Sequence, residues 1–256
     1  MIVSSGTKKP NIHASAYVAP TATVSGDVTI EEGCAVLFGA VLSAEGAPLV
    51  VGANSVVMEN AVLKSSGGKA IQFPCSIGES CIIGPGAYIV GATIEPGAFI
   101  ASNARVFNGA TIEEGVSVAI GAIVHVNTRV KTGQHVPMLN IAHGDPATIY
   151  SPRLAEEVHG KMHFFQDVFN LPDSDDVRAK AAGNYSKFLR KTHAQDASIA
   201  DAPKKPAPKG PPRKTEEPPP TQATEVEKVV DVMFLELEEA RLRREAAIER
   251  TKKTKR

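Results

Sequence analysis

The chain has 256 residues, enough for one substantial domain with appendages or for two small domains. Its 28 basic residues match its 28 acidic residues, so no overall charge favours nucleic acid or an anionic membrane surface. Three cysteines do not suit a disulfide framework, and no apolar run approaches the roughly 18 residues that a membrane span needs. These features predict a soluble, cytoplasmic protein.

Aliphatic residues recur at every sixth position through the first half of the chain. A period of six fits neither a helix of 3.6 residues per turn nor the two-residue alternation of a flat strand. It fits a parallel β-helix over residues 1–150, in which each six-residue unit makes one short strand and one turn and three units close a triangular coil. The residues expected to stack inside it are Ile12, Val18, Val24, Ile30, Val36, Leu42, Val51, Val57, Leu63, Ile77, Ile83, Ile89, Ile94, Ile100, Val106, Ile112, Val118, Val124, Val130 and Val136.

The repeat is interrupted twice, at about residues 44–49 and 64–76. The second interruption reads KSSGGKAIQFPCS, and we expect it to form a trimer-contact or lid-like loop. Cys75 lies within it and is expected to be unreactive. Neither interruption contains a histidine that could serve as a general base.

Residues 151–195 are expected to form helices that pack on the prism. The first is predicted to start at Ser151 as N-cap, with Pro152 as its first residue. His159, His163 and Asp167 fall at i, i+4 and i+8 and would share one face of this helix. Such spacing can chelate a metal but also arises by chance, and packing is the favoured role. Its apolar stripe is Leu154, Val158, Met162, Phe165 and Phe169.

A second helix is predicted from Asp173 to about Lys191. Asp173 or Ser174 would cap it. The side chains expected to turn inward are Val177, Ala181, Phe188 and Leu189.

Residues 196–223 are rich in proline and lysine and are predicted to form a disordered linker. Residues 224–256 return to a helical pattern, with an apolar face followed by a basic end. An amphipathic helix beyond a long linker is typical of partner docking, although it could also return to the prism. The candidate docking residues are Val226, Val229, Val230, Met233, Phe234 and Leu237.

Several stretches carry a family resemblance: AYVAPTATVSGDVTIEEGCAVLFGAVL, VGANSVVMENAVLK, IGPGAYIVGATI and VAIGAIVHVNTRV. In order and spacing they resemble the hexapeptide-repeat proteins of the gamma-class carbonic anhydrase type, over about residues 10–150. The resemblance implies a left-handed β-helix, a homotrimer and a C-terminal helix along the prism.

The same resemblance implies where zinc would be bound. The three histidine ligands of active members match Lys64, Pro85 and Val90 in this chain. Pro85 and Val90 have no side-chain donor, and Lys64 would bring a cation to the site of a cation. The family's arginine and aspartate after the second coil are also replaced, in the stretch Ser43 to Glu45. We therefore expect no zinc and no other cofactor.

His125 is the main remaining candidate for a rebuilt metal site. It follows Val124 as Val90 follows Ile89, so it is expected in the same lateral column as Phe107 and Val90. Those neighbours are poor ligands, and a solvated or interface histidine is the simpler interpretation. His143 is expected to lie in a loop.

The sequence thus favours a non-catalytic, trimeric scaffold or assembly protein that recruits a protein partner through its C-terminal helix. The alternatives are a hexapeptide-repeat acyltransferase that uses acyl-coenzyme A, and a carbonic anhydrase with a rebuilt metal site. Nucleic acid is not an expected partner.

Overall fold

The computed structural model describes residues 1–67, 71–161, 163–172 and 174–199. Residues 1–203 form one compact unit, and the chain beyond them belongs to a second unit that lies outside the described residues. The predicted linker from residue 200 onward and the terminal helix with its docking candidates therefore stay predictions.

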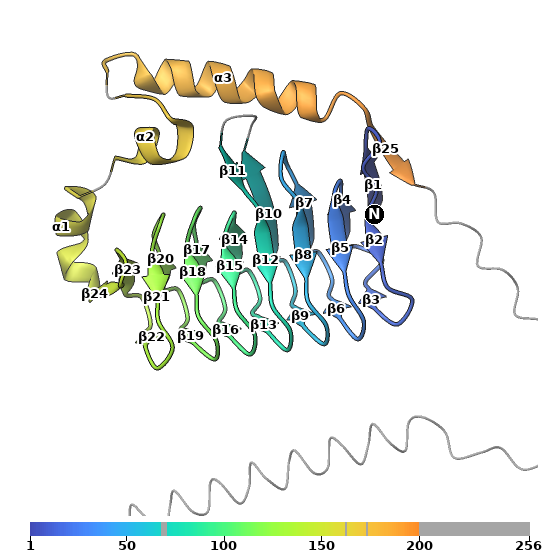
Figure 1. Cartoon of the computed structure of the whole chain (residues 1–256), viewed down its shortest axis with the longest axis horizontal. Helices are drawn as coiled ribbons and strands as arrows, with labels where there is room; N and C mark the ends of the chain where they lie inside the picture. Colours follow the sequence, from blue (N-terminus) through green and yellow to red (C-terminus); the bar gives the residue numbers. More distant parts are fainter. Residues whose placement is uncertain (68–70, 162, 173, 200–256) are drawn as a thin grey trace, which may run out of the picture. The chain divides into compact units, whose positions relative to one another are not determined.

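The described unit is a parallel β-helix, as the six-residue period predicts (Figure 1). Its strands form three sheets, one for each face of the prism. Face A comprises β1 (Ile2–Ser5), β4 (Thr23–Ser25), β7 (Val41–Ala44), β10 (Val62–Gly67), β14 (Tyr88–Val90), β17 (Arg105–Val106), β20 (Ile123–Val124) and β23 (Ile141–His143), with β24 (Thr148–Tyr150), β25 (Asp196–Ile199) and β11 (Gln72–Phe73) added at its edges.

The other two faces are parallel throughout. Face B comprises β2 (Asn11–Ile12), β5 (Val28–Ile30), β8 (Leu49–Val51), β12 (Cys75–Ile77), β15 (Thr93–Ile94), β18 (Thr111–Ile112) and β21 (Arg129–Val130). Face C comprises β3 (Tyr17–Val18), β6 (Ala35–Val36), β9 (Val56–Val57), β13 (Ile82–Ile83), β16 (Phe99–Ile100), β19 (Ser117–Val118) and β22 (His135–Val136).

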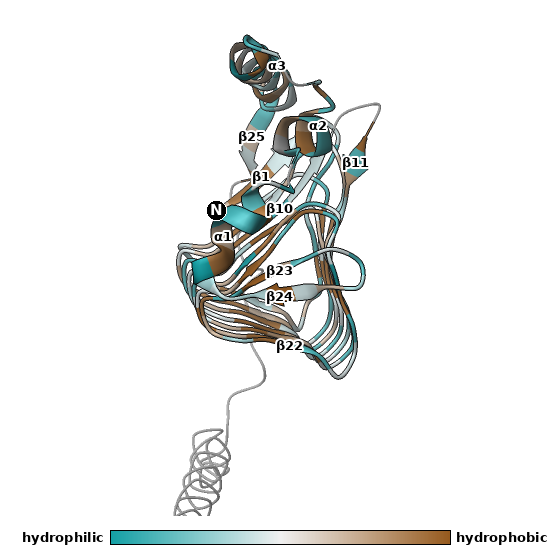
Figure 2. Cartoon of the chain, turned by 90° about the vertical axis from the view of Figure 1, so that its left-hand side faces the viewer, coloured by the Kyte–Doolittle hydropathy of each residue, from teal (hydrophilic) through white to brown (hydrophobic). Residues whose placement is uncertain are grey.

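The predicted inward residues form the core. From Val24 to Val136 every one of them is at most 1% exposed, and Ile12 and Val18 at the open first coil are partly buried. The registers place them directly above one another, as in the stack Leu42, Leu63 and Ile89 on face A. Figure 2 views the prism along its axis, with the coils behind one another, and shows the triangular section that encloses this core. Burial of these stacked aliphatic side chains provides the driving force for coiling.

Tight corners between the faces require residues with positive φ. Gly33 has a φ of 65°, and a Cβ built on it would collide with Oδ1 of Asn54 in the next coil, which itself has a φ of 58°. Glycine is therefore needed at this corner, and asparagine tolerates the left-handed conformation beside it.

The segment predicted as one first helix is broken into three pieces. These are η1 (Pro152–Leu154), α1 (Ala155–His159) and α2 (Phe164–Phe169). Ser151 is the N-cap of η1 but makes no side-chain capping bond. Val158 of the predicted stripe is buried, whereas Leu154 is 45% exposed. The prediction of a single amphipathic helix was therefore wrong. The break follows Gly160, a poor helix former.

The second predicted helix is confirmed as α3 (Val177–Thr192), with Val177 and Ala181 buried. Its N-cap is Asp176 rather than Asp173 or Ser174. α3 runs beside face A from the last coils back toward the first (Figure 1). It is followed by β25, which pairs antiparallel with β1, so the first four residues of the predicted linker form a strand. No described helix is long and apolar enough to cross a membrane.

Candidate functional site

A column of outward side chains runs along face A, at the ends of its strands. The registers align Ser25 with Ser43, Ser43 with Lys64, and Lys64 with Val90. Lys64 and Val90, two of the three positions that the sequence resemblance matches to zinc ligands, are therefore neighbours. The third, Pro85, lies in the turn between β13 and β14, at a corner of the prism.

The column continues through the later coils as the sequence predicts. Val106 pairs with Val124, and Val124 with Ala142, so the residues that follow them stand side by side. The ring centroids are 6.1 Å apart for Phe107 and His125, and 5.7 Å apart for His125 and His143. His143 thus ends strand β23 and does not lie in a loop.

Lys64 is held by a buried carboxylate. Its Nζ lies 2.9 Å from Oε1 of Glu45, and the side chains are 23% and 7% exposed, respectively. Glu45 sits in the first interruption of the repeat, where its backbone N–H donates to the hydroxyl of Ser65. Gly46 follows with a φ of 83°, and a side chain there would collide with the carbonyl oxygen of Gly67. This turn therefore fixes Glu45 against the strand that carries Lys64.

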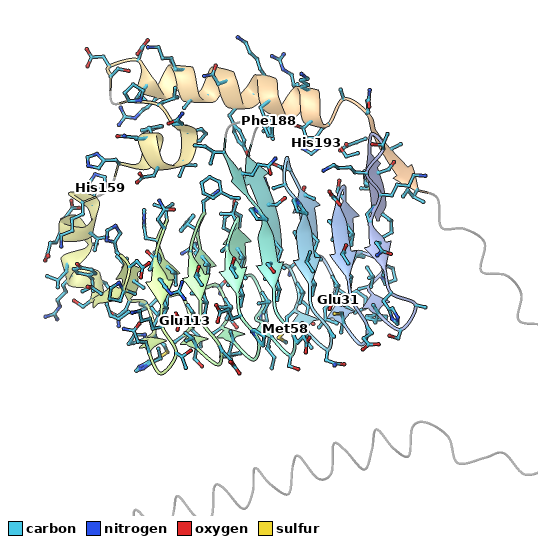
Figure 3. All side chains as sticks on the ribbon, viewed as in Figure 1. Glu31, Met58, Glu113, His159, Phe188 and His193 are labelled. Carbon is cyan, nitrogen blue, oxygen red and sulfur yellow. The ribbon has the colours of Figure 1, made fainter. Side chains whose placement is uncertain are left out.

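The helix α3 and the residue that caps its C-terminus add two further groups to Glu45. The hydroxyl of Tyr185 donates to Oε2 at 3.5 Å, and Nε2 of His193 lies 3.7 Å from Oε1. The other ring nitrogen of His193, Nδ1, lies 2.7 Å from Oδ2 of Asp196. Figure 3 shows His193 and Phe188 on the side of α3 that faces the strands. Glu45 is thus an anchor that joins the β-helix to its C-terminal helix.

The ionisation of Lys64 follows from this arrangement. Burial lowers the pKa of Lys64, but the hydrogen bond and the charge of Glu45 outweigh burial and hold that pKa above its usual value of 10.5. Lys64 therefore remains a cation at neutral pH.

These residues do not fit a zinc site. Zinc takes nitrogen, sulfur or oxygen donors at about 2.0 to 2.3 Å. Pro85 and Val90 carry no such side-chain donor, and Nζ of Lys64 is already paired with Glu45. Among the described residues, no three or more His, Cys, Asp or Glu side chains are grouped to hold a metal. The prediction that His159 and His163 share a helix face was wrong, because His159 ends α1 and His163, beyond the break at Gly160, is the non-helical N-cap of α2.

His125 is the most unusual titratable group of the column. Its Nδ1 is buried and has no hydrogen-bond partner among the described residues. Burial lowers the pKa of the His125 imidazole, His143 lowers it further, and Asp167 of α2 acts in the opposite direction. The ring is therefore held neutral against the column.

The cysteines show no sign of nucleophilic activation. All three are buried and free, and burial raises the pKa of Cys75 to about 12. A thiol with this pKa carries almost no reactive thiolate at neutral pH. Cys75 is therefore unreactive, as predicted.

A cavity of about 480 Å³ lies on the column beside Lys64. Val90 and Phe107 line it from the strands, and Tyr185 and Phe188 line it from α3. The second interruption of the repeat forms its side wall, as the antiparallel hairpin of β10 and β11. The sequence identified Phe188 as inward but missed Tyr185 and His193, because their partners lie more than a hundred residues away.

Comparison with known proteins supports the family resemblance. Over 198 residues the chain is 31% identical to gamma carbonic anhydrase 1, mitochondrial, of Arabidopsis thaliana. This match covers 73% of this chain and 68% of the relative. The chain belongs to the gamma carbonic anhydrase family. Gamma carbonic anhydrase 3, mitochondrial, of the same plant is 35% identical over 101 residues, which is 38% of each chain. No protein-family model matches the chain.

Among solved structures, a hexapeptide transferase family protein from Anaplasma phagocytophilum is similar in fold. It is 18% identical, with a TM-score of 0.47, and the match covers 76% of this chain and 98% of that one. A likeness of this degree does not bear on the function of this family member.

We expect Glu45→Gln to lower the free energy of unfolding by about 1–3 kcal/mol, because it leaves the half-buried Lys64 cation without its partner. Urea unfolding would measure the loss. Asp27→Asn is the matched control: it breaks the exposed pair of Asp27 with Lys8 and should cost about 0–1 kcal/mol. Adding Lys64→Met to Glu45→Gln should restore part of the stability. Equal losses in the two single variants would contradict the anchor role of Glu45.

The lowered pKa of His125 makes stability depend on pH. The His125 imidazole has a pKa near 6.5 in the unfolded chain and a lower pKa in the folded chain, so the unfolded chain binds the proton more readily. The stabilising contribution is therefore complete above that pH and is lost as the pH falls through the lower folded-state pKa. We expect His125→Phe to flatten the decline measured by urea unfolding at successively lower pH. His135→Phe, at an exposed position of β22, should keep the original slope, and an unchanged slope in His125→Phe would refute the assignment.

Proposed function

We propose that this chain is a non-catalytic member of the gamma carbonic anhydrase family that serves as a trimeric scaffold or assembly protein. The observation that carries the proposal is the ion pair of Lys64 with Glu45, which occupies a position matched to a family zinc ligand. The pair, together with Pro85 and Val90, leaves no donor set for zinc there. Without zinc there is no metal-bound water to attack carbon dioxide.

Assembly into a trimer is supported by apolar side chains exposed on face C and at its corner with face A. Ile82 and Phe99 are paired neighbours on adjacent coils and are 44% and 42% exposed. Exposed apolar rows of this kind are typical of interfaces between protein chains. The further exposed members are Tyr17, Phe38, Ile120, Met138 and Leu139.

The C-terminal segment is the proposed recruiting element. Its apolar stripe from Val226 to Leu237 is typical of a helix that docks in a groove of a partner, and three copies on one trimer would gain from multivalency. For the location of the protein, we propose the cytoplasm, where three free cysteines would stay reduced. The two Arabidopsis relatives are named as mitochondrial proteins, so a reducing compartment of another kind is the alternative.

Metal content and native mass test the first part of the proposal. Purified after expression with added zinc, the full chain should hold well below one zinc per chain and have the native mass of three chains. Phe99→Glu should reduce the native mass, because it places a carboxylate in the apolar row. Thr93→Glu, at an exposed position of face B, is the control and should leave the mass unchanged. One zinc per chain would instead support the rebuilt carbonic anhydrase, and strong thermal stabilisation by acyl-coenzyme A would support acyl transfer.

Truncation tests the recruiting role. A chain ending at Ile199 keeps the pairing of β25 with β1 and should remain a trimer, with the native mass of three shortened chains and an unchanged thermal stability, but lose any protein that copurifies stoichiometrically with the full chain. Val230→Asp in the full chain should cause the same loss, because it charges the apolar stripe. Lys228→Asp, on the opposite face of the predicted helix, should not. Retention of every partner by the truncated chain would refute the recruiting role.

A further inference from the structure

The cavity on face A has no role in the proposed scaffold, and its chemistry is specific. Its floor is the column residues Val90 and Phe107 together with Tyr88, and its roof is the inner side of α3. The β10–β11 hairpin and α2 close its sides. At about 480 Å³ its volume falls within the range of about 300–1,000 Å³ that is usual for small-molecule sites.

Aromatic rings dominate both walls. On the strand side, the ring centroids of Tyr88 and Phe107 are 6.3 Å apart. On the helix side, Tyr185 packs edge-on to Phe169 at 5.9 Å and is stacked with Phe188 at 6.2 Å and 12°. Two opposed walls of rings favour a flat, apolar molecule, which would stack or pack edge-on against them.

The lining residues that the structure describes offer no charge to an ionic ligand. None of its fourteen described lining residues is charged. The ion pair of Lys64 with Glu45, whose carboxylate accepts a hydrogen bond from the lining residue Tyr185, is already internally neutralised. A charged molecule would lose its hydration without gaining a partner, so the lining selects a neutral one.

One buried polar side chain of the lining has an acceptor atom without a partner among the described residues. Asn108 lines the cavity and is only 6% exposed. Its Nδ2 donates to the hydroxyl of Ser66 at 2.5 Å, and its Oδ1 accepts no hydrogen bond from any residue that the structure describes. Among those residues, Nδ1 of His125 is the only unpartnered side-chain atom that is sealed from solvent. Oδ1 of Asn108 is unpartnered but not sealed, and Asn108 lines the cavity, so a molecule in the cavity can reach this oxygen. A buried acceptor of this kind is stabilised when a donor reaches it.

We propose that this cavity binds a neutral, flat aromatic molecule that carries one O–H or N–H donor, with the rings between the two aromatic walls and the donor on Oδ1 of Asn108. The proposal does not depend on the scaffold role, because the cavity could bind such a molecule whether or not the protein recruits a partner.

N-phenyl-1-naphthylamine is a suitable probe, because it is neutral, has aromatic rings and one N–H, and fluoresces strongly only in apolar surroundings. Titration into the full-length protein should give a saturable rise in fluorescence. 1-Naphthol should displace the probe at a roughly tenfold lower concentration than 1-methylnaphthalene, which has the same rings but no donor. Asn108→Leu should abolish that preference while keeping the thermal unfolding midpoint.

A pair of variants on α3 locates the binding. Asn184→Trp places a large ring at the exposed rim of the cavity and should reduce probe binding at least severalfold. Ser186→Trp, exposed on the same helix but outside the lining, should bind as the unmodified chain does. The chain has no tryptophan of its own, so quenching of the single introduced indole at residue 184 by the probe gives a second readout.

Three results would overturn the proposal: no saturable binding by the full-length protein, equal binding by the two tryptophan variants, or equal displacement by the two competitors. A native mass that changes with probe concentration would show that the probe binds between chains, and would also contradict it. None of these outcomes affects the metal content or the partner recruitment that test the proposed function.

Discussion

The stacking of one aliphatic side chain upon the next, at every sixth residue, is the constraint on which the rest of this structure depends. Leu42, Leu63 and Ile89 illustrate it on face A, where each contacts the residues one coil above and below. Because the inward position is fixed at this period, the residues beside it always point outward and stand in register with their counterparts in neighbouring coils. The fold therefore supplies straight columns of exposed side chains whose identities are free to vary.

That freedom explains how one column can change its chemistry without loss of the fold. Lys64 and Val90 leave the inward stack undisturbed, since the neighbouring Leu63 and Ile89 remain fully buried. The column instead gains an ion pair with Glu45 and a row of rings. Both features face α3, so the side chains of this column fasten the C-terminal helix and enclose a cavity.

The features that could be read from the sequence are those set by local period. Twenty inward positions, the column of Val90, Phe107 and His125, and the burial of Val177 and Ala181 all follow from spacing alone. The remainder depends on contacts between distant segments. Tyr185 and His193 meet Glu45 only after α3 folds back along the coils, and β25 becomes a strand only because β1 offers it an edge. Gly160 stands in the sequence, but a single glycine within a helical pattern is tolerated as often as it ends a helix, so it does not by itself predict the break.

The pairing of β25 with β1 has a consequence for the ends of the molecule. A β-helix finishes in strands whose backbone groups are unpaired, and such edges can add further chains without limit. Face A carries an antiparallel strand at each end, β25 on β1 and β24 on β23. An incoming parallel coil would find those edges already occupied on this face. On face A the reversed strands thus act as stops against the addition of further parallel coils.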